Sequence, residues 1–330
     1  MKAIAVDTET PGRPLRWAEI PDPQIGPREV LVDVHATAVN RADLLQRAGG
    51  YPPPPGAPET LGLELAGVVA EAGGEVSRAR PGDRVCALLA GGGYAERASV
   101  DERLLIPMPD DWDYARGAAV PEVFLTACLN LFEEAGLQAG ETVLVHGGAS
   151  GVGTAAIQLS RHQGCRVLAT AGTGAKRDLC RRLGAELAVD YRNGFREAVA
   201  DHLGASEGGV DVVLDVAGAS HLADNIECLG LKGRLVVLSL LGGSRAELDL
   251  SLLLRKRLRI VGSLLRARPV EEKAHIISRF RTRFLDALID GRLEPVIDRV
   301  MPIEEAGAAH AVLERNENLG KVILQVREER

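Results

Sequence analysis

The spacing of apolar positions separates the chain into two kinds of segment. In the first 110 residues short apolar runs are separated by Gly- and Pro-rich turns, and "EVLVDVHATAV" (29–39) alternates as a half-buried strand does. The runs "LAGVVAEAG" (65–73) and 82–100 continue this pattern. It predicts a β-rich module with little helix.

From Val120 onward, helical and strand-like segments alternate. "PEVFLTACLNLFEEAG" (121–136) has helical spacing and ends at Gly136. Further helices are expected at 153–164 and 175–184, and Val- or Leu-rich strands at 142–147, 166–171, 187–191, 210–218, 234–243 and 259–265. Continuous apolar strands that alternate with helices indicate a doubly wound parallel sheet covered on both faces.

The alternation ends near residue 266, where an amphipathic stretch (270–290) begins. The last apolar run, "KVILQV" (321–326), reads as a strand with no helix after it, so we expect it to return to the first module. A chain of 330 residues is longer than one hydrophobic core usually serves. The sequence therefore predicts an α/β protein with one domain from 1–120 and 267–330 and a second from 121–266.

Composition narrows the class of protein. The net charge of −7 argues against a general polyanion binder, and 3% aromatic residues argue against a base-stacking surface. The five cysteines form no C-x-x-C pair, which is typical of reduced thiols in a cytoplasmic protein. We expect no membrane span, because no apolar run is long enough, and no signal peptide at the N-terminus.

One segment departs from this acidic balance. Residues 255–283 hold ten Lys and Arg side chains against Glu271 and Glu272. A solvated helix face explains such a run, and so does a nearby anionic ligand or nucleic acid. The seven histidines show no metal-ligand spacing, and His146 is interpreted as a packed or capping residue.

A glycine-rich stretch, "GASGVG" (148–153), follows a predicted strand and opens a predicted helix. Ser150 stands where a dinucleotide-binding fingerprint normally has its second glycine. The helix N-terminus after Gly151 still offers N–H groups to a phosphate. We therefore interpret the stretch as a cofactor loop of a variant kind, against the alternative of a structural turn.

The next strand indicates which cofactor. NAD-selective enzymes usually place an acid there to bind the ribose 2′-hydroxyl. This chain has Gly172 and Thr173 at that point, followed by Lys176 and Arg177, and its first acid is Asp178 inside the helix. Cations without a carboxylate favour the 2′-phosphate of NADP(H), although exposed basic residues at a helix start are the alternative.

Two long strings carry a family resemblance along the whole chain. "VNRADLLQRAGGYPPPPGAPETLGLELAG" (39–67) and "HGGASGVGTAAIQLSR" (146–161) resemble the zinc-free quinone oxidoreductases of the medium-chain dehydrogenase/reductase superfamily. "SLLRAR" (263–268) and "NENLGKVIL" (316–324) are similar to its tumour-suppressor-induced branch. The resemblance implies a GroES-like catalytic domain together with a Rossmann cofactor domain.

The same resemblance shows departures from the zinc alcohol dehydrogenases. Those enzymes place a Cys ligand near the position of Asn40 and a His before the Glu of a G-H-E motif. Here that motif reads Gly62-Leu63-Glu64, and the four-cysteine zinc lobe is missing. We therefore expect no metal.

The resemblance also implies the site residues. Asn40 and Tyr51 would line the pocket above the nicotinamide as the catalytic residues. The residues implied to bind the cofactor are Ser150, Gly151 and Val152 at the pyrophosphate, Gly172, Lys176 and Tyr191 at the 2′-phosphate, and Thr126, Leu240, Leu264, Leu265 and Asn318 along the groove. The three leucines are alternatively core residues, and Asn318 is alternatively a helix cap.

The activity implied is NADPH-dependent reduction of a quinone by hydride transfer. An enoyl-thioester reductase is the alternative enzyme, and an RNA-binding protein like zeta-crystallin is the alternative from another class. By analogy with the family we expect a cytoplasmic homodimer that pairs through the strand near 259–265.

Overall fold

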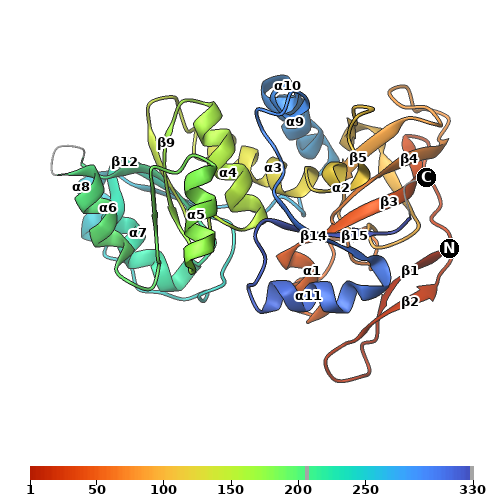
Figure 1. Cartoon of the computed structure of the whole chain (residues 1–330), viewed down its shortest axis with the longest axis horizontal. Coiled ribbons are helices and arrows are strands. Elements are labelled where there is room, and N and C mark those ends of the chain that lie inside the picture. Colours follow the sequence, from red (N-terminus) through yellow and green to blue (C-terminus); the bar gives the residue numbers. More distant parts are fainter. Residues whose placement is uncertain (205–207, 328–330) are drawn as a thin grey trace. The chain divides into compact units, whose positions relative to one another are not determined.

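The computed structural model describes residues 1–204 and 208–327. These residues form two compact units (Figure 1). Unit 1 comprises Met1–Leu125 and Leu265–Arg330, and unit 2 comprises Thr126–Leu264. The first boundary falls inside a helix, α3 (Pro121–Cys128), whereas the sequence placed it ahead of this helix. The α/β fold class is confirmed.

Unit 1 is built on a seven-stranded sheet in the order β14-β15-β3-β4-β5-β7, with β6 also paired to β3. Its strands are β3 (Glu29–Val39), β4 (Glu64–Ala72), β5 (Arg84–Leu88), β6 (Arg97–Asp101), β7 (Leu105–Pro107), β14 (Ile297–Pro302) and β15 (Lys321–Gln325). A separate antiparallel pair is formed by β1 (Lys2–Val6) and β2 (Leu15–Glu19).

The C-terminal strand returns to the first module, as the sequence predicted. β15 runs antiparallel to β3, with Val322 opposite Val39 and Ile323 opposite Ala38 (Figure 1). These residues are almost completely buried. A segment from the end of the chain therefore completes the centre of the sheet in unit 1.

The helices of unit 1 flank this sheet. They are α1 (Arg41–Arg47), α2 (Tyr114–Ala118), α9 (Val270–Phe280), α10 (Asp286–Ile289) and α11 (Ala306–Glu314), together with the start of α3. The apolar pattern gave no sign of α1, since the helix is short and mostly polar. Its start is fixed locally, because the Asp43 carboxylate accepts a hydrogen bond from the Asn40 backbone N–H at 2.8 Å.

Unit 2 is a six-stranded sheet in the order β10-β9-β8-β11-β12-β13, and all its strand pairs are parallel. The strands are β8 (Thr142–Val145), β9 (Arg166–Thr170), β10 (Leu187–Val189), β11 (Val210–Asp215), β12 (Leu229–Val237) and β13 (Arg259–Gly262). Its helices are α4 (Gly151–His162), α5 (Gly174–Arg182), α6 (Phe195–Leu203), α7 (Leu222–Cys228) and α8 (Leu250–Lys256), and α3 continues as a π-helical turn, Leu129–Glu134.

The strand order of unit 2 reverses at β8. The chain runs outward from β8 to β9 and β10, then crosses back to β11 on the other side of β8. Doubly wound sheets bind ligands at the carboxyl ends of the strands where the order reverses. The glycine-rich loop joins β8 to α4, and so lies at this point.

None of the helices in the described residues has the length and apolar character needed to cross a bilayer. The five cysteines are buried and present as free thiols.

Candidate functional site

The glycine-rich loop of unit 2 ends in a capped helix. Ser150 is the N-cap of α4, and its Oγ accepts a hydrogen bond from the Gly153 N–H at 3.0 Å. The first N–H groups of a helix have no acceptor within the helix itself. Because the serine takes that of Gly153, the N–H groups of Gly151 and Val152 remain as donors for a phosphate at the positive end of α4.

Two glycines of this loop permit close approaches, one within the loop and the start of α4 and the other between the loop and α5. A Cβ on Gly153 would lie 2.2 Å from the carbonyl oxygen of Gly147, and a Cβ on Gly148 would lie 2.7 Å from the Cys180 Sγ. No side chain fits in either place. The loop therefore keeps the tight strand–turn–helix geometry of a dinucleotide site, although Ser150 replaces one glycine.

The turn after β9 brings together residues that the sequence assigned to the 2′-phosphate. A Cβ on Gly172 would lie 3.2 Å from Tyr191 Cε1, so these two residues are in contact. Arg192 donates a hydrogen bond to the Gly172 carbonyl, and its guanidinium carbon lies 5.7 Å from the centroid of the Tyr191 ring. Tyr191 and Arg192 follow β10, the neighbouring strand of the sheet.

Lys176 lies in the first turn of α5, and its residue is only 8% exposed. The nearby acid, Asp190, is held by two arginines: Arg192 Nε donates at 2.8 Å and Arg177 Nη1 at 3.3 Å. The hydrogen bond from Arg192 lowers the pKa of Asp190 below its ordinary value. The rim of the Gly172 turn is therefore cationic, and the Asp190 carboxylate beside it is already paired.

The other cofactor residues implied by the resemblance divide between the units. Thr126, Leu240 and Leu264 belong to unit 2, and Leu265 and Asn318 to unit 1. Leu240 and Leu264 are each 55% exposed and so are not core residues, whereas Leu265 is buried. Asn318 Nδ2 donates to the Gly320 carbonyl at 2.7 Å, so it closes a turn rather than capping a helix.

Thr126 shows an unmet hydrogen-bonding need. Its hydroxyl oxygen is buried and has no hydrogen-bond partner in the described part of the chain. Its backbone carbonyl accepts from Asn130 Nδ2 at 2.7 Å. A buried hydroxyl without a partner costs free energy, which a ligand amide or hydroxyl would recover.

In unit 1, Asn40 belongs to a buried ion-pair network. Lys321 Nζ lies 2.7 Å from Glu64 Oε1 and 2.7 Å from Asn40 Oδ1. Asn40 Nδ2 donates to the same Glu64 oxygen at 2.8 Å and to the Ala38 carbonyl at 3.3 Å. Both ends of the Asn40 amide are therefore bound within the protein, and the longer bond, to Ala38, is the weaker one.

Tyr51 is held by an arginine. The guanidinium carbon of Arg266 lies 5.2 Å from the centroid of the Tyr51 ring, and Arg266 Nη1 donates to the Tyr51 carbonyl at 3.4 Å. Arg266 also donates to the Ala90 carbonyl at 2.8 Å and to Gln46 Oε1 at 2.7 Å. The Tyr51 hydroxyl has no hydrogen-bond partner among the residues that the structure describes.

A second acid of unit 1, Asp43, lies in the same buried region. It accepts hydrogen bonds from the backbone N–H groups of Asn40 at 2.8 Å and Gly62 at 3.0 Å. Burial raises the pKa of Asp43 to about 6. The Tyr94 hydroxyl lies 3.4 Å from Asp43 Oδ2 and 3.2 Å from His310 Nε2, which closes this polar network on the side of α11.

The sequence analysis did not identify several of these residues as part of the site, although the sequence held a partial indication of them. Glu64 and Lys321 are charges at the first positions of largely apolar strands, and Glu122 lies in the first turn of an apolar helix. Such positions are costly for an unpaired charge, and they often indicate a partner distant in sequence. Arg192 carried no such sign, because it lies in a largely polar turn, and Arg266 was counted only as a member of the basic segment.

His146 is packed, as the sequence indicated. Its Nδ1 lies 2.9 Å from Thr170 Oγ1 and its Nε2 lies 2.7 Å from Asn225 Oδ1. Burial lowers the pKa of His146 to about 3, so this imidazole is neutral.

The basic segment is not one solvated face. Arg266 and Lys273 are each 4% exposed and donate to backbone carbonyls of unit 1. Lys256, in unit 2, donates to three carbonyls at the end of α7 and the start of β12. Several cations of the basic segment therefore donate hydrogen bonds within the protein.

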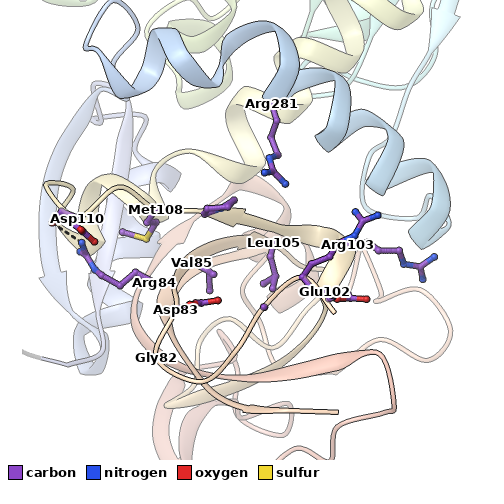
Figure 2. Close-up of a pocket in the computed structure, with 13 residues that line it drawn as sticks. Gly82, Asp83, Arg84, Val85, Glu102, Arg103, Leu105, Met108, Asp110 and Arg281 are labelled. Carbon is purple, nitrogen blue, oxygen red and sulfur yellow. Dashed lines mark hydrogen bonds between the residues drawn. The ribbon is translucent and has the colours of Figure 1, made fainter. Parts of the chain in front are cut away.

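Another member of the segment, Arg281, reaches into a cavity of about 570 Å³ in unit 1 (Figure 2). The cavity is lined by charges of both signs and includes none of the implied site residues. Its lining arginines Arg84 and Arg103 are bound by the protein, at Pro109 and Asp101 respectively. This mixed lining does not select an anion.

Within residues 1–204 and 208–327, no group of three or more His, Cys, Asp and Glu side chains is placed to hold a metal ion.

Two family models match the chain. The alcohol dehydrogenase GroES-like domain matches residues 26–110, and the zinc-binding dehydrogenase model matches residues 151–280. Among curated proteins, the quinone oxidoreductase-like protein 2 of Bos taurus is 34% identical over 317 residues, covering 96% of this chain and 90% of that protein. The quinone oxidoreductase of Mus musculus is 32% identical over 310 residues, covering 92% and 91%.

Solved structures give the same result. The quinone oxidoreductase of Thermus thermophilus, which was also solved in complex with NADPH, has a TM-score of 0.82 at 32% identity over 99% of this chain and 100% of that one. A mycobacterial protein solved in complex with NADPH has a TM-score of 0.85 at 30% identity over the same shares. The chain therefore belongs to the quinone oxidoreductase family of the medium-chain dehydrogenases and reductases.

Proposed function

We propose that the protein is an NADPH-dependent reductase that transfers a hydride to a quinone without a metal. The chain is an NADP-dependent oxidoreductase by its family, and the quinone is the finer part of the proposal. One observation carries it: Arg266 fixes the ring of Tyr51 while the Tyr51 hydroxyl has no partner in the described chain. A fixed, free phenol is a ready donor for an oxygen that gains charge.

NADP(H) fits the residues of unit 2. The N–H groups of Gly151 and Val152 would hold the pyrophosphate, and the unpartnered Thr126 hydroxyl would bind the carboxamide end. The 2′-phosphate would lie at the cationic rim formed by Gly172, Lys176, Tyr191 and Arg192. Leu240 and Leu264 are the further residues of unit 2 that we propose for cofactor binding, and Leu265 and Asn318 are those of unit 1.

NADPH, when bound, supplies the hydride. The residues of unit 1 then have to orient the acceptor and stabilise its oxygen. We propose Tyr51 as the main donor. Asn40 is the second catalytic residue, and its amide reaches the acceptor by giving up its bond to Ala38, which at 3.3 Å is the longer of its two.

The ion pair between Lys321 and Glu64 supports a metal-free site. This ion pair lies beside Asn40, near the position at which the zinc alcohol dehydrogenases have a zinc-binding cysteine. Here the ammonium group of Lys321 contacts Asn40 instead. A quinone is already electrophilic and needs no Lewis acid to accept a hydride. Elemental analysis of the purified protein, with activity measured before and after chelation, tests this part.

The decisive experiment is an NADPH oxidation assay with para-benzoquinone and with crotonyl-coenzyme A. Faster turnover of the quinone supports the proposal, and faster turnover of the thioester would replace it with an enoyl-thioester reductase. Turnover of neither, together with salt-dependent retention on RNA, would favour a binding role.

We also propose that the protein is a cytoplasmic homodimer. β13 pairs with β12 on one side only, and it is the edge of the sheet in unit 2. Ile260 on this strand is 41% exposed and Leu254 on α8 is 77% exposed. An apolar edge strand is a template for pairing with a second copy. The buried free thiols are typical of a reducing compartment.

A further inference from the structure

Two glutamates of unit 1 lie together in opposite environments. Glu64 is bound on both oxygens: Oε1 accepts from Lys321 and Asn40, and Oε2 accepts from the backbone N–H of Glu122 at 2.8 Å. Glu122 Oε2, by contrast, is buried and has no hydrogen-bond partner in the described part of the chain. Both oxygens of Glu64 therefore have hydrogen-bond donors, whereas Oε2 of Glu122 has none in the described chain.

Charged groups from four neighbouring elements act on Glu122. Glu64 (β4) and Asp43 (α1) disfavour its ionised form, whereas Lys321 (β15) and Lys273 (α9) favour it. Burial, followed by the neighbouring Glu64 carboxylate, raises the pKa of Glu122 to about 8. At neutral pH this carboxyl group therefore carries a proton.

Glu122 also lies within electrostatic range of Tyr51 and Arg266. Lys273, which acts on Glu122, donates from Nζ to the backbone carbonyl of Arg266 at 2.6 Å. The group that holds the proton and the residues that hold the proposed acceptor thus belong to one cluster. Two nearby carboxyl groups whose environments separate their protonation states are a common arrangement for acid catalysis.

We propose that Glu122 is the catalytic acid that protonates the oxygen of the acceptor bound beside Tyr51. This inference rests on the proposed quinone reduction. The hydride brings two electrons to the quinone and leaves a hydroquinone monoanion. The O–H bond of Glu122 then breaks, its proton forms the second O–H bond of the hydroquinone, and the carboxylate is reprotonated from solvent.

The surrounding cations suit both states of Glu122. When the proton has left, Lys273, Lys321 and Arg266 stabilise the carboxylate that remains. Solvent can return the proton because the residue as a whole is only partly buried, although Oε2 is covered. The Tyr51 hydroxyl holds the acceptor oxygen during the transfer.

The test compares Glu122→Gln with Glu59→Gln, which makes the same change at an exposed position in the Tyr51 loop. In the wild type, kcat with para-benzoquinone should fall as pH rises through about 8, because Glu122 loses its proton. Glu122→Gln should lower kcat by about tenfold to a hundredfold and abolish this pH dependence. The KM for NADPH should not change, and Glu59→Gln should behave as the wild type.

A second measurement needs neither NADPH nor quinone. Infrared difference spectra of the free protein should show the carbonyl band of a protonated carboxyl group that disappears as pH rises through about 8. Glu122→Gln should lack this band and Glu59→Gln should keep it. A band that persists in Glu122→Gln, or an unchanged kcat profile in that variant, overturns the assignment. If the band behaves as expected but the protein does not reduce quinones, the proposed quinone reduction is wrong, whereas the protonation of Glu122 stands.

Discussion

The guanidinium group of Arg266 covers the ring of Tyr51, with 5.2 Å between its central carbon and the ring centroid. The arginine is 4% exposed and forms no ion pair with a carboxylate in the described chain. Burial lowers its pKa from the ordinary arginine value, but a guanidinium remains charged at any pH that proteins tolerate. Unit 1 therefore keeps a positive charge beside the residue proposed to bind the acceptor.

Arg266→Met should loosen Tyr51 and remove this charge. We expect the KM for quinone to rise and the free energy of unfolding to fall by about 1–3 kcal/mol, because Ala90 and Gln46 lose a buried donor. Arg266→Lys should recover the charge without the stacked, three-way contact. Arg268→Met is the control, because it removes a guanidinium from the same segment whose partner, Glu272, has a side chain that is 55% exposed. Equal effects at both positions would contradict a specific role for Arg266.

Tyr51→Phe separates the two enzyme activities. A quinone delocalises the incoming charge over its ring, so loss of one neutral hydrogen bond should lower quinone turnover by about tenfold or less. An enoyl thioester forms an enolate that depends on its donor, and the same change would cost about a hundred- to a thousandfold. NADPH affinity should be retained. The quinone proposal is wrong if the wild type prefers crotonyl-coenzyme A and this variant loses that activity.

Lys176→Ala and Arg192→Ala should each weaken NADPH while leaving NADH almost unchanged. Charge-assisted hydrogen bonds to a phosphate are worth about 1.5–3 kcal/mol, or roughly ten- to a hundredfold in affinity. Fluorescence titration with both cofactors measures this difference. Arg182→Ala is a matched control, because it removes an exposed charge from the same helix. Equal losses for NADPH and NADH would show that the residue does not recognise the 2′-phosphate.

Stability should depend on pH through the buried acids of unit 1. Folded Glu122 holds its proton up to about pH 8, whereas an ordinary glutamate releases it near 4.5. In this window the folded state binds more protons than the unfolded state, so the free energy of unfolding should fall as pH rises. Asp43 acts in the same direction between 3.8 and about 6. Denaturant unfolding of Glu122→Gln should show a flatter profile up to about pH 8, and a profile parallel to that of the wild type would refute this.

Ile260→Lys should prevent the proposed pairing of β13. A lysine at an edge strand opposes association because its charge would be buried in the interface. Light scattering should show a dimer for the wild type and a monomer for this variant. Ile289→Lys changes a residue that is similarly exposed, at 43%, in unit 1, and it should remain dimeric. A wild type that is monomeric at micromolar concentration would contradict the proposal.

The sequence predicted most of the fold because local patterns carry it. Continuous apolar runs predicted the strands of unit 2. The last run, which forms β15, was expected to return to the first module because no helix follows it. The candidate site was harder to predict from the sequence, because its contacts join residues that are far apart in the chain. Lys321 meets Glu64 across 257 positions, and Arg266 meets Gln46 across 220. The local periodicity of apolar and polar positions carries no information about such distant pairs.

Asn40 illustrates the same limit at one residue. The family resemblance implied that Asn40 lines the substrate pocket, and the structure adds that its amide already binds Lys321 and Glu64. Whether a polar side chain is available depends on its partners, and these lie on other strands. Charged residues in largely apolar strands were the indication that the sequence offered. They point to buried partners but do not identify them.

The interrupted arrangement of unit 1 has a consequence for synthesis on the ribosome. Unit 2 is one continuous segment, Thr126–Leu264, so all its strands have emerged before the last part of unit 1 is made. Unit 1 must wait for β14 and β15, and only then do Arg266 and Lys321 reach Tyr51 and Glu64. Domains generally fold as units when their chain is available. The Rossmann-like unit 2 can therefore fold first in the nascent protein, and unit 1 completes its sheet only after β14 and β15 have been translated.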